Sequence, residues 1–223
     1  MNEVLPPLDA APGSTLADAA SRKLRDDIVT GVRRPGERLR IDRLREHYGV
    51  GASPLREALQ RLSAEGLVLV EGNRGFTVAP LDPEEFADLT CARVAVEREA
   101  LRLSILKGGS DWEGEVVSAA YLMSKADKDV APGTDTWETA NTSFHRALVS
   151  ACGSEWLLRV RDNLHRLAER YRRASVARAG SKRDLGKEHA ALTQAVLDRN
   201  IDLACTLIEQ HYAKTEEELR VIE

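Results

Sequence analysis

Three histidines in the second half of the chain lie where imidazole side chains could act together on a metal ion. His145 follows Asn141 by four residues, so both side chains point from one face of a predicted helix. His189 and His211 fall within the apolar stripes of two later predicted helices, and both are expected to face inward. Burying imidazole costs free energy unless a partner binds it, and neutral imidazole is a favoured ligand of first-row divalent metals. The spacing alone leaves two interpretations open: hydrogen-bonded core histidines or a metal site.

The other residues with reactive side chains show no arrangement typical of catalysis. His47 and His165 are interpreted as core histidines with hydrogen-bond partners. The cysteines Cys91, Cys152 and Cys205 are odd in number and widely separated, which excludes a disulfide framework and a thiolate zinc site. This cysteine usage favours a reducing cytoplasm. The sequence also contains no glycine-rich phosphate loop, no serine-centred nucleophile elbow and no HExxH motif.

The composition is that of a globular, mainly α-helical protein. Of the 223 residues, 43% are apolar and 4% are aromatic, and the net charge is −4. No apolar stretch approaches the roughly 20 residues of a membrane-spanning helix. Residues 1–13, predicted to be a disordered tail, lack the pattern of a signal peptide. Basic residues outnumber acidic ones over 20–80, whereas acidic residues are in excess over 81–223. This asymmetry indicates two domains, and a basic first domain is typical of nucleic-acid binding.

Residues 84–223 are predicted to form the all-helical domain that positions the histidines. A proline-containing segment at 80–83 is predicted to link it to the first domain. Apolar residues recur at helical spacing over 84–107. Turn signals follow at 108–109, 131–133, 152–154 and 180–181. They divide the remainder so that five or six helices are expected in this domain. An antiparallel bundle is the simplest architecture for this pattern.

Residues 14–79 show the pattern of a winged helix-turn-helix. Apolar residues at helical spacing predict three helices, of which the second ends at Gly49. The third is predicted to begin with Ser53 as its capping residue, followed by a proline in the first helical position. Two strands are predicted at 68–70 and 76–78, joined by a glycine-flanked turn. Three helices and a hairpin in this order predict DNA binding through the third helix.

A longer motif supports that prediction. Residues 44–59 read LREHYGVGASPLREAL, and RL and EGL follow at 61–62 and 65–67. This segment resembles the winged helix of the GntR family, and the resemblance covers about residues 14–80. Ala52 stands where the family frequently has a base-reading arginine, so a different operator sequence is expected. The resemblance implies a palindromic double-stranded DNA operator, a homodimer, and DNA-binding roles for four residues: Ser53, Arg56, Arg74 and Gly75.

The second domain resembles the helical FCD domain found in one subgroup of these regulators. The resemblance rests on Arg93 with Glu97, on NTSFH at 141–145, on the Glu188–His189 pair and on His211. It implies a divalent metal, with zinc as the expected ion and nickel or manganese as alternatives, held by four residues: Asn141, His145, His189 and His211. It also implies that Arg93 binds a small carboxylate effector. The alternative for Arg93 is a salt bridge to Glu97, four residues further along the helix.

These observations together predict a homodimeric, DNA-binding transcription regulator, in this family usually a repressor, and not an enzyme. Its helical domain is expected to sense a small organic acid through the metal. A metallohydrolase is one alternative, because three histidines with an open position also hold catalytic zinc. It would lack a general base, since Glu188 points about 100° away from His189 on the helix and is expected to face away from the metal. A metal-free regulator that responds to acyl-CoA is the second alternative.

Overall fold

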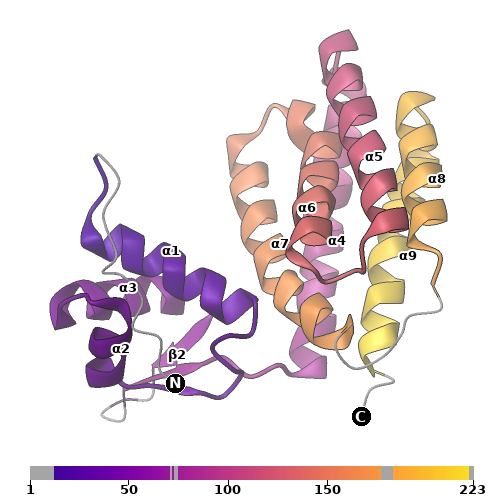
Figure 1. Cartoon of the computed structure of the whole chain (residues 1–223). Helices are drawn as coiled ribbons and strands as arrows, with labels where there is room; N and C mark the ends of the chain where they lie inside the picture. Colours follow the sequence, from indigo (N-terminus) through magenta and orange to yellow (C-terminus); the bar gives the residue numbers. More distant parts are fainter. Residues whose placement is uncertain (1–12, 71, 73–74, 177–182, 221–223) are drawn as a thin grey trace. The chain divides into compact units, whose positions relative to one another are not determined.

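The computed structural model describes residues 13–70, 72, 75–176 and 183–220, and the tail predicted at 1–13 lies outside them except for its last residue. The chain divides into two compact units, Met1–Leu81 and Asp82–Glu223. Within the described ranges, none of the helices has the length and apolar character needed to span a bilayer. Figure 1 shows the helices and strands of each unit.

The first unit is the predicted winged helix, with one strand that the sequence pattern did not reveal. Its elements are, in order, α1 (Leu16–Val29), β1 (Arg38–Leu39), α2 (Ile41–Tyr48), α3 (Ala52–Ala64), β2 (Val68–Val70) and β3 (Phe76–Val78). The three strands form an antiparallel sheet in the order β1-β3-β2. Strand β1 escaped prediction because two residues are too short to show alternation; its pairing with β3, Arg38 opposite Thr77, defines it.

The helices of this unit begin and end largely at the expected signals, with one exception at α3. Thr15 caps α1, and Gly49, in the left-handed conformation with φ 65°, ends α2. We expected Ser53 to cap α3, and this prediction was wrong. Gly51 is the capping residue and makes no side-chain hydrogen bond, so α3 starts two residues earlier. Pro54 then occupies the third helical position, where its missing N–H still costs no intrahelical bond.

The second unit is the predicted helical bundle. In the described part of the chain it has six α-helices and a short 3₁₀ helix: α4 (Pro83–Lys107), α5 (Ser110–Asp129), α6 (Asp135–Val149), η2 (Ser150–Cys152), α7 (Glu155–Val176), α8 (Leu185–Leu197) and α9 (Ile201–Arg220). Asp82 caps α4, and a proline follows it in the first turn. Helix α4 packs against α7 and α9, while α5 packs against α6 and α8, and α8 also contacts α9.

One contiguous apolar core fills this bundle and sets the orientation of the later helices. Phe144 of α6, Leu192 of α8 and Ile208 of α9 all belong to it and are at most 1% exposed. Each of these residues lies within one helical turn of a histidine on the same helix. The burial of the apolar stripes therefore turns those histidines toward the interior of the bundle.

Candidate metal centre

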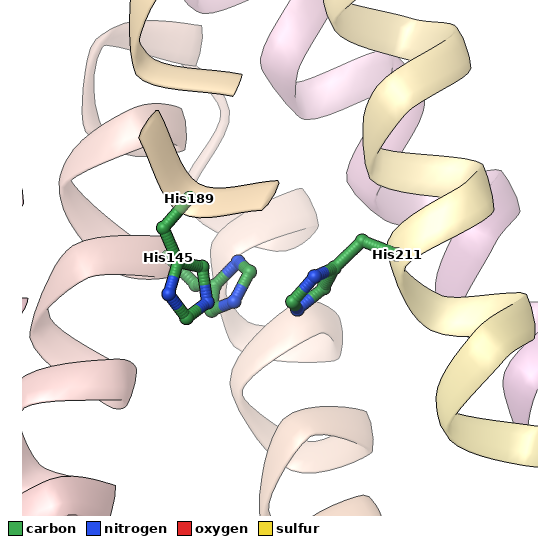
Figure 2. Close-up of side chains that lie close together, drawn as sticks. All are labelled: His145, His189 and His211. Atoms are coloured by element: carbon green, nitrogen blue, oxygen red, sulfur yellow. The ribbon is translucent and has the colours of Figure 1, made fainter. Parts of the chain in front are cut away.

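The three histidines of the sequence pattern meet inside the bundle. His145 on α6, His189 on α8 and His211 on α9 are 1%, 4% and 8% exposed. One nitrogen from each ring lies within 4.8 Å of those of the other two, and Figure 2 shows the rings gathered between the helices. The donor set is chemically suited to a late first-row divalent metal, because imidazole nitrogen is a ligand these ions favour.

The environment of His189 provides a direct test of whether a metal fits. Its Nδ1 lies 2.7 Å from Oδ2 of Asp127, a side chain that is 6% exposed. The other carboxylate oxygen, Oδ1, accepts a hydrogen bond of 3.0 Å from Nε1 of Trp137. The carboxylate therefore holds the proton of His189 on Nδ1 and leaves a lone pair on Nε2. That Nε2 atom is buried and, among the described residues, has no hydrogen-bond partner. A bound metal would satisfy it.

His211 has the same arrangement. Its Nδ1 lies 2.9 Å from Oε2 of Glu188 and 3.1 Å from Nη2 of Arg183. The two hydrogens of that Nη2 are taken by Glu188 and by the backbone oxygen of His211. The Nδ1 of His211 therefore donates to Glu188, and its Nε2 is the nitrogen left to bind a metal.

The position of Glu188 corrects one expectation. We predicted that its side chain would face away from the metal site, but its carboxylate contacts His211. The turn of about 100° between Glu188 and His189 points Glu188 at α9, which packs against α8. Although burial raises the pKa of Glu188, hydrogen bonds from Arg183 and His211 hold it well below the usual value. A carboxylate held this firmly in its ionised form is a poor general base.

Burial keeps two of the histidines, His145 and His211, in the neutral form that binds metals. Burial lowers the pKa of His145 well below its usual value, and the neighbouring His211 and His189 lower it further. Burial also lowers the pKa of His211 to about 3, despite the opposing effect of Glu188. Metal binding to these two rings therefore requires no proton release near neutral pH.

Asn141 lies beside the cluster on α6. It is 2% exposed and lines the same small cavity as His145 and His211. The described part of the chain places no carboxylate in the group of ligand atoms that gather around the three histidines. The amide oxygen of Asn141 is thus one neutral oxygen ligand on this wall, which also includes the hydroxyl groups of Tyr212 and Thr215.

Arg93 of α4 lines this cavity, which has a volume of about 50 Å³. The residue is 3% exposed, and its guanidinium carbon lies 4.0 Å from the centre of the Tyr212 ring. The predicted alternative, a salt bridge from Arg93 to Glu97, is wrong, because Glu97 pairs with Arg161 at 3.0 Å. Within the described ranges, no hydrogen bond or ion pair reaches the Arg93 guanidinium. Burial lowers its pKa. A buried cation without a carboxylate is a strong receptor for an anion.

The winged helix has a basic hollow of its own, with a volume of about 670 Å³. Four arginines line it together with Gly75: Arg38, Arg40, Arg43 and Arg56. Arg56 and Ser53 are exposed on α3, and Gly75, immediately before β3, has a φ of 99°. Arg74, predicted to contact DNA from the wing, lies outside the described residues. Sequence reasoning did not single out the arginines before α3; their density between the first and third helices was the available signal.

Comparison with known proteins identifies the family. Residues 16–78 match the family model described as bacterial regulatory proteins, gntR family, and residues 88–214 match the FCD domain. The chain belongs to the GntR family. This confirms the resemblance seen in the sequence, and it makes the protein a DNA-binding transcriptional regulator.

Relatives agree with this assignment, and solved structures share the fold of the chain. The regulator is 38% identical to the HTH-type transcriptional regulator BphR of Paraburkholderia xenovorans (strain LB400), over 92% of this chain and 85% of that protein. It is 39% identical to the HTH-type transcriptional repressor GlaR of Escherichia coli (strain K12), over 85% of this chain and 89% of that protein. Its fold matches E. coli McbR/YncC with a TM-score of 0.75 at 18% identity, covering 92% and 97% of the two chains. The structure of a putative transcriptional regulator from Rhodococcus sp. RHA1 matches with a TM-score of 0.74 at 22% identity, covering 93% of this chain and 98% of that chain.

Proposed function

We propose that this GntR regulator is a homodimeric repressor whose helical unit binds a divalent metal and a small carboxylate effector. The observation that carries the proposal is that two unpartnered buried groups lie close together, one beside a cavity and one lining it. The buried Nε2 of His189 lacks a hydrogen-bond partner among the described residues, and the cavity beside it contains the unpaired guanidinium of Arg93. A metal and an anion are the two species that satisfy these groups.

The proposed metal ligands are the three histidines together with Asn141. Two of the imidazoles are oriented by carboxylates, Asp127 for His189 and Glu188 for His211. A neutral amide oxygen in place of a carboxylate leaves the bound ion with its full positive charge toward other ligands. A bound metal would offer an open coordination position to an anionic oxygen. Zinc is the proposed ion, and nickel and manganese are the alternatives to test.

The proposed effector pairs with Arg93. Since the guanidinium is buried and forms no ion pair with any residue that the structure describes, an anionic ligand gains a charge-assisted hydrogen bond in a low-dielectric surrounding. A carboxylate matches the planar guanidinium geometry through two parallel hydrogen bonds. The cavity is small and is lined by residues of α4, α6, α7, α8 and α9, so the effector is proposed to be a small organic acid.

DNA contacts are proposed for α3 and the wing. Ser53 and Arg56 are exposed on α3, and Gly75 immediately precedes β3, while Arg74 is proposed from the sequence alone. The basic hollow beside α3 adds further positive charge along the same surface, as expected for contacts to the phosphate backbone. Two copies would read two half-sites of a palindromic operator, because a two-fold dimer imposes two-fold symmetry on its DNA. Effector binding would favour one placement of the two winged helices, with a typical coupling of about 1–3 kcal/mol.

The test combines DNA binding with ligand binding in one purified protein. Fluorescence anisotropy on DNA from the region upstream of the protein's own coding sequence should show selective binding that weakens steeply as salt rises. A panel of small carboxylic acids is then added to zinc-loaded and metal-stripped protein, with melting temperature and DNA release as readouts. We expect an acid that stabilises only the zinc-loaded form and releases the DNA. Salt-insensitive or unselective DNA binding refutes the regulator part, and the absence of any effect of zinc refutes the metal part.

The variant Arg93→Met separates the effector site from the metal site. It removes the guanidinium while keeping a long side chain in the cavity, so zinc content should remain at the wild-type level. Release of DNA by the active acid should be lost, because the anion receptor is gone. Exposed Arg98 on the same helix provides the matched control, and Arg98→Met should respond to the acid as the wild type does. An unchanged response of Arg93→Met contradicts the proposed effector site.

A further inference from the structure

The Nδ1 atom of His145 contacts a hydroxyl group, whereas the other two rings of the cluster each donate through Nδ1 to a carboxylate. In the part of the chain that the structure describes, this Nδ1 lies 3.4 Å from the hydroxyl oxygen of Tyr212 on α9. Tyr212 is 2% exposed, so water does not compete for the contact. A hydroxyl group both donates and accepts hydrogen bonds, and its surroundings must decide the direction of this one.

The direction of the hydrogen bond decides whether His145 can bind a metal. If the hydroxyl donates to Nδ1, the neutral ring carries its proton on Nε2, which then has no lone pair for an ion. If Nδ1 donates to the hydroxyl oxygen, Nε2 keeps its lone pair and is free to bind. The second arrangement requires another acceptor for the proton of the Tyr212 hydroxyl.

Glu97 of α4 is that acceptor. It is 2% exposed and forms an ion pair with Arg161 of α7, whose Nε lies 3.0 Å from Oε2 and whose Nη2 lies 3.2 Å from Oε1. Burial raises the pKa of Tyr212, and the charge of Glu97 and a hydrogen bond to its carboxylate raise it further. A hydrogen bond to an ionised acceptor is roughly twice as strong as one between neutral groups. The hydroxyl therefore donates to Glu97 and accepts from His145.

Building on the proposed metal site, we propose that Tyr212 is a positioning residue that holds the proton of His145 on Nδ1 and leaves Nε2 for the metal. Its hydroxyl transmits the attraction of the Glu97 carboxylate to the ring. All three imidazoles then share one arrangement, a negative charge behind Nδ1, which acts directly on two rings and through a phenol on the third. Partners that orient metal-binding histidines typically contribute about 10–100-fold to metal affinity.

The substitution Tyr212→Phe isolates the hydroxyl group. The guanidinium carbon of Arg93 lies 4.0 Å from the centre of the Tyr212 ring, and phenylalanine keeps both this ring and its volume. The matched control is Tyr171→Phe, because Tyr171 is also buried, at 5% exposed, and its hydroxyl donates to a carboxylate, Oε2 of Glu85, at 3.0 Å. Both variants lose one buried hydroxyl group, but Tyr212 alone contacts a histidine of the cluster among the described residues.

The first measurement is the position of the His145 proton in metal-stripped, full-length protein near neutral pH. It uses ¹⁵N-detected NMR of the imidazole rings, with the signals assigned through their absence in His145→Ala. We expect the proton on Nδ1 in the wild type and a shift toward Nε2 in Tyr212→Phe. A wild-type ring that carries its proton on Nε2 overturns the proposal, whether or not the variant folds.

The second measurement is the affinity for zinc, obtained by competition with a chromophoric chelator, with melting temperature as the check of folding. Tyr212→Phe should bind zinc about tenfold more weakly than the wild type, whereas Tyr171→Phe should match the wild type. Wild-type affinity in folded Tyr212→Phe overturns the role of Tyr212 and leaves the metal site standing. Equal weakening in both variants also overturns it, because lost packing then explains the effect. No zinc binding by the wild type refutes the proposed metal site, and this role with it.

Discussion

Asp127 provides the sharpest test of the proposed metal site, because its two oxygens hold the ligand in one protonation state. Oδ2 accepts from Nδ1 of His189 at 2.7 Å, and Oδ1 accepts from Nε1 of Trp137 at 3.0 Å. In Asp127→Asn, one orientation of the amide turns its NH₂ toward Trp137, where two donors meet. The other turns the NH₂ toward His189, which moves the proton of the ring to Nε2 and blocks metal binding.

The expected decrease in zinc affinity follows from the loss of the Asp127 carboxylate. Removal of a carboxylate that orients a metal-binding histidine typically weakens metal affinity 10–100-fold, or about 1.4–2.7 kcal/mol. One orientation of the amide loses a good hydrogen bond, and the other keeps both hydrogen bonds only by placing the ring proton on the Nε2 atom that would bind the metal. We therefore expect Asp127→Asn to reach the upper part of that range.

Competition against a chromophoric chelator measures the zinc affinity, and ¹⁵N-detected NMR of the imidazole rings reports the position of the proton. The matched control is Asp129→Asn at the exposed end of α5, which should leave both readouts unchanged. Circular dichroism checks that each variant is folded. Wild-type zinc affinity in folded Asp127→Asn would refute the assignment of His189 as a ligand oriented by this carboxylate.

Three further predictions concern the ligands, the core and the DNA surface. In His145→Ala, zinc measured by mass spectrometry should fall from about one ion per chain to near zero at matched free zinc; equal content removes His145 from the ligand set. Burial lowers the pKa of His165 well below its usual value, so only the unfolded state gains this proton below about pH 6.5. Stability is therefore lost as pH falls. His165→Gln should reduce the slope of the unfolding free energy against pH, measured by urea titrations between pH 6.5 and 5, by up to about 1.4 kcal/mol per pH unit. An unchanged slope in the variant contradicts this. Arg56→Ala should weaken operator binding by about 1–3 kcal/mol, whereas Arg98→Ala on the helical unit should not, and equal losses in the two variants would remove Arg56 from the DNA surface.

The local structure was predictable because its causes are close together in the sequence. The apolar stripe of α3, the glycine that ends α2 and the hairpin strands depend on residues a few positions apart. The three histidines were found in the same way, since each lies on the apolar face of its own helix. Even local signals compete, however: Ser53 and Gly51 were both able to begin α3, and the helix starts after the glycine.

The surroundings of the site depended on the tertiary structure. Asp127 contacts His189, which is 62 positions away in the sequence. Glu97 pairs with Arg161, 64 positions away, and not with Arg93, which lies one turn before it. No periodicity encodes such pairs, because they arise from which helices pack together and at what depth. The sequence by itself determined the family, the two-part organisation and the inward-facing histidines. Only the packing of α4, α5, α6, α8 and α9 decided which carboxylates orient the rings and which buried groups, Arg93 and Nε2 of His189, have no partner among the described residues.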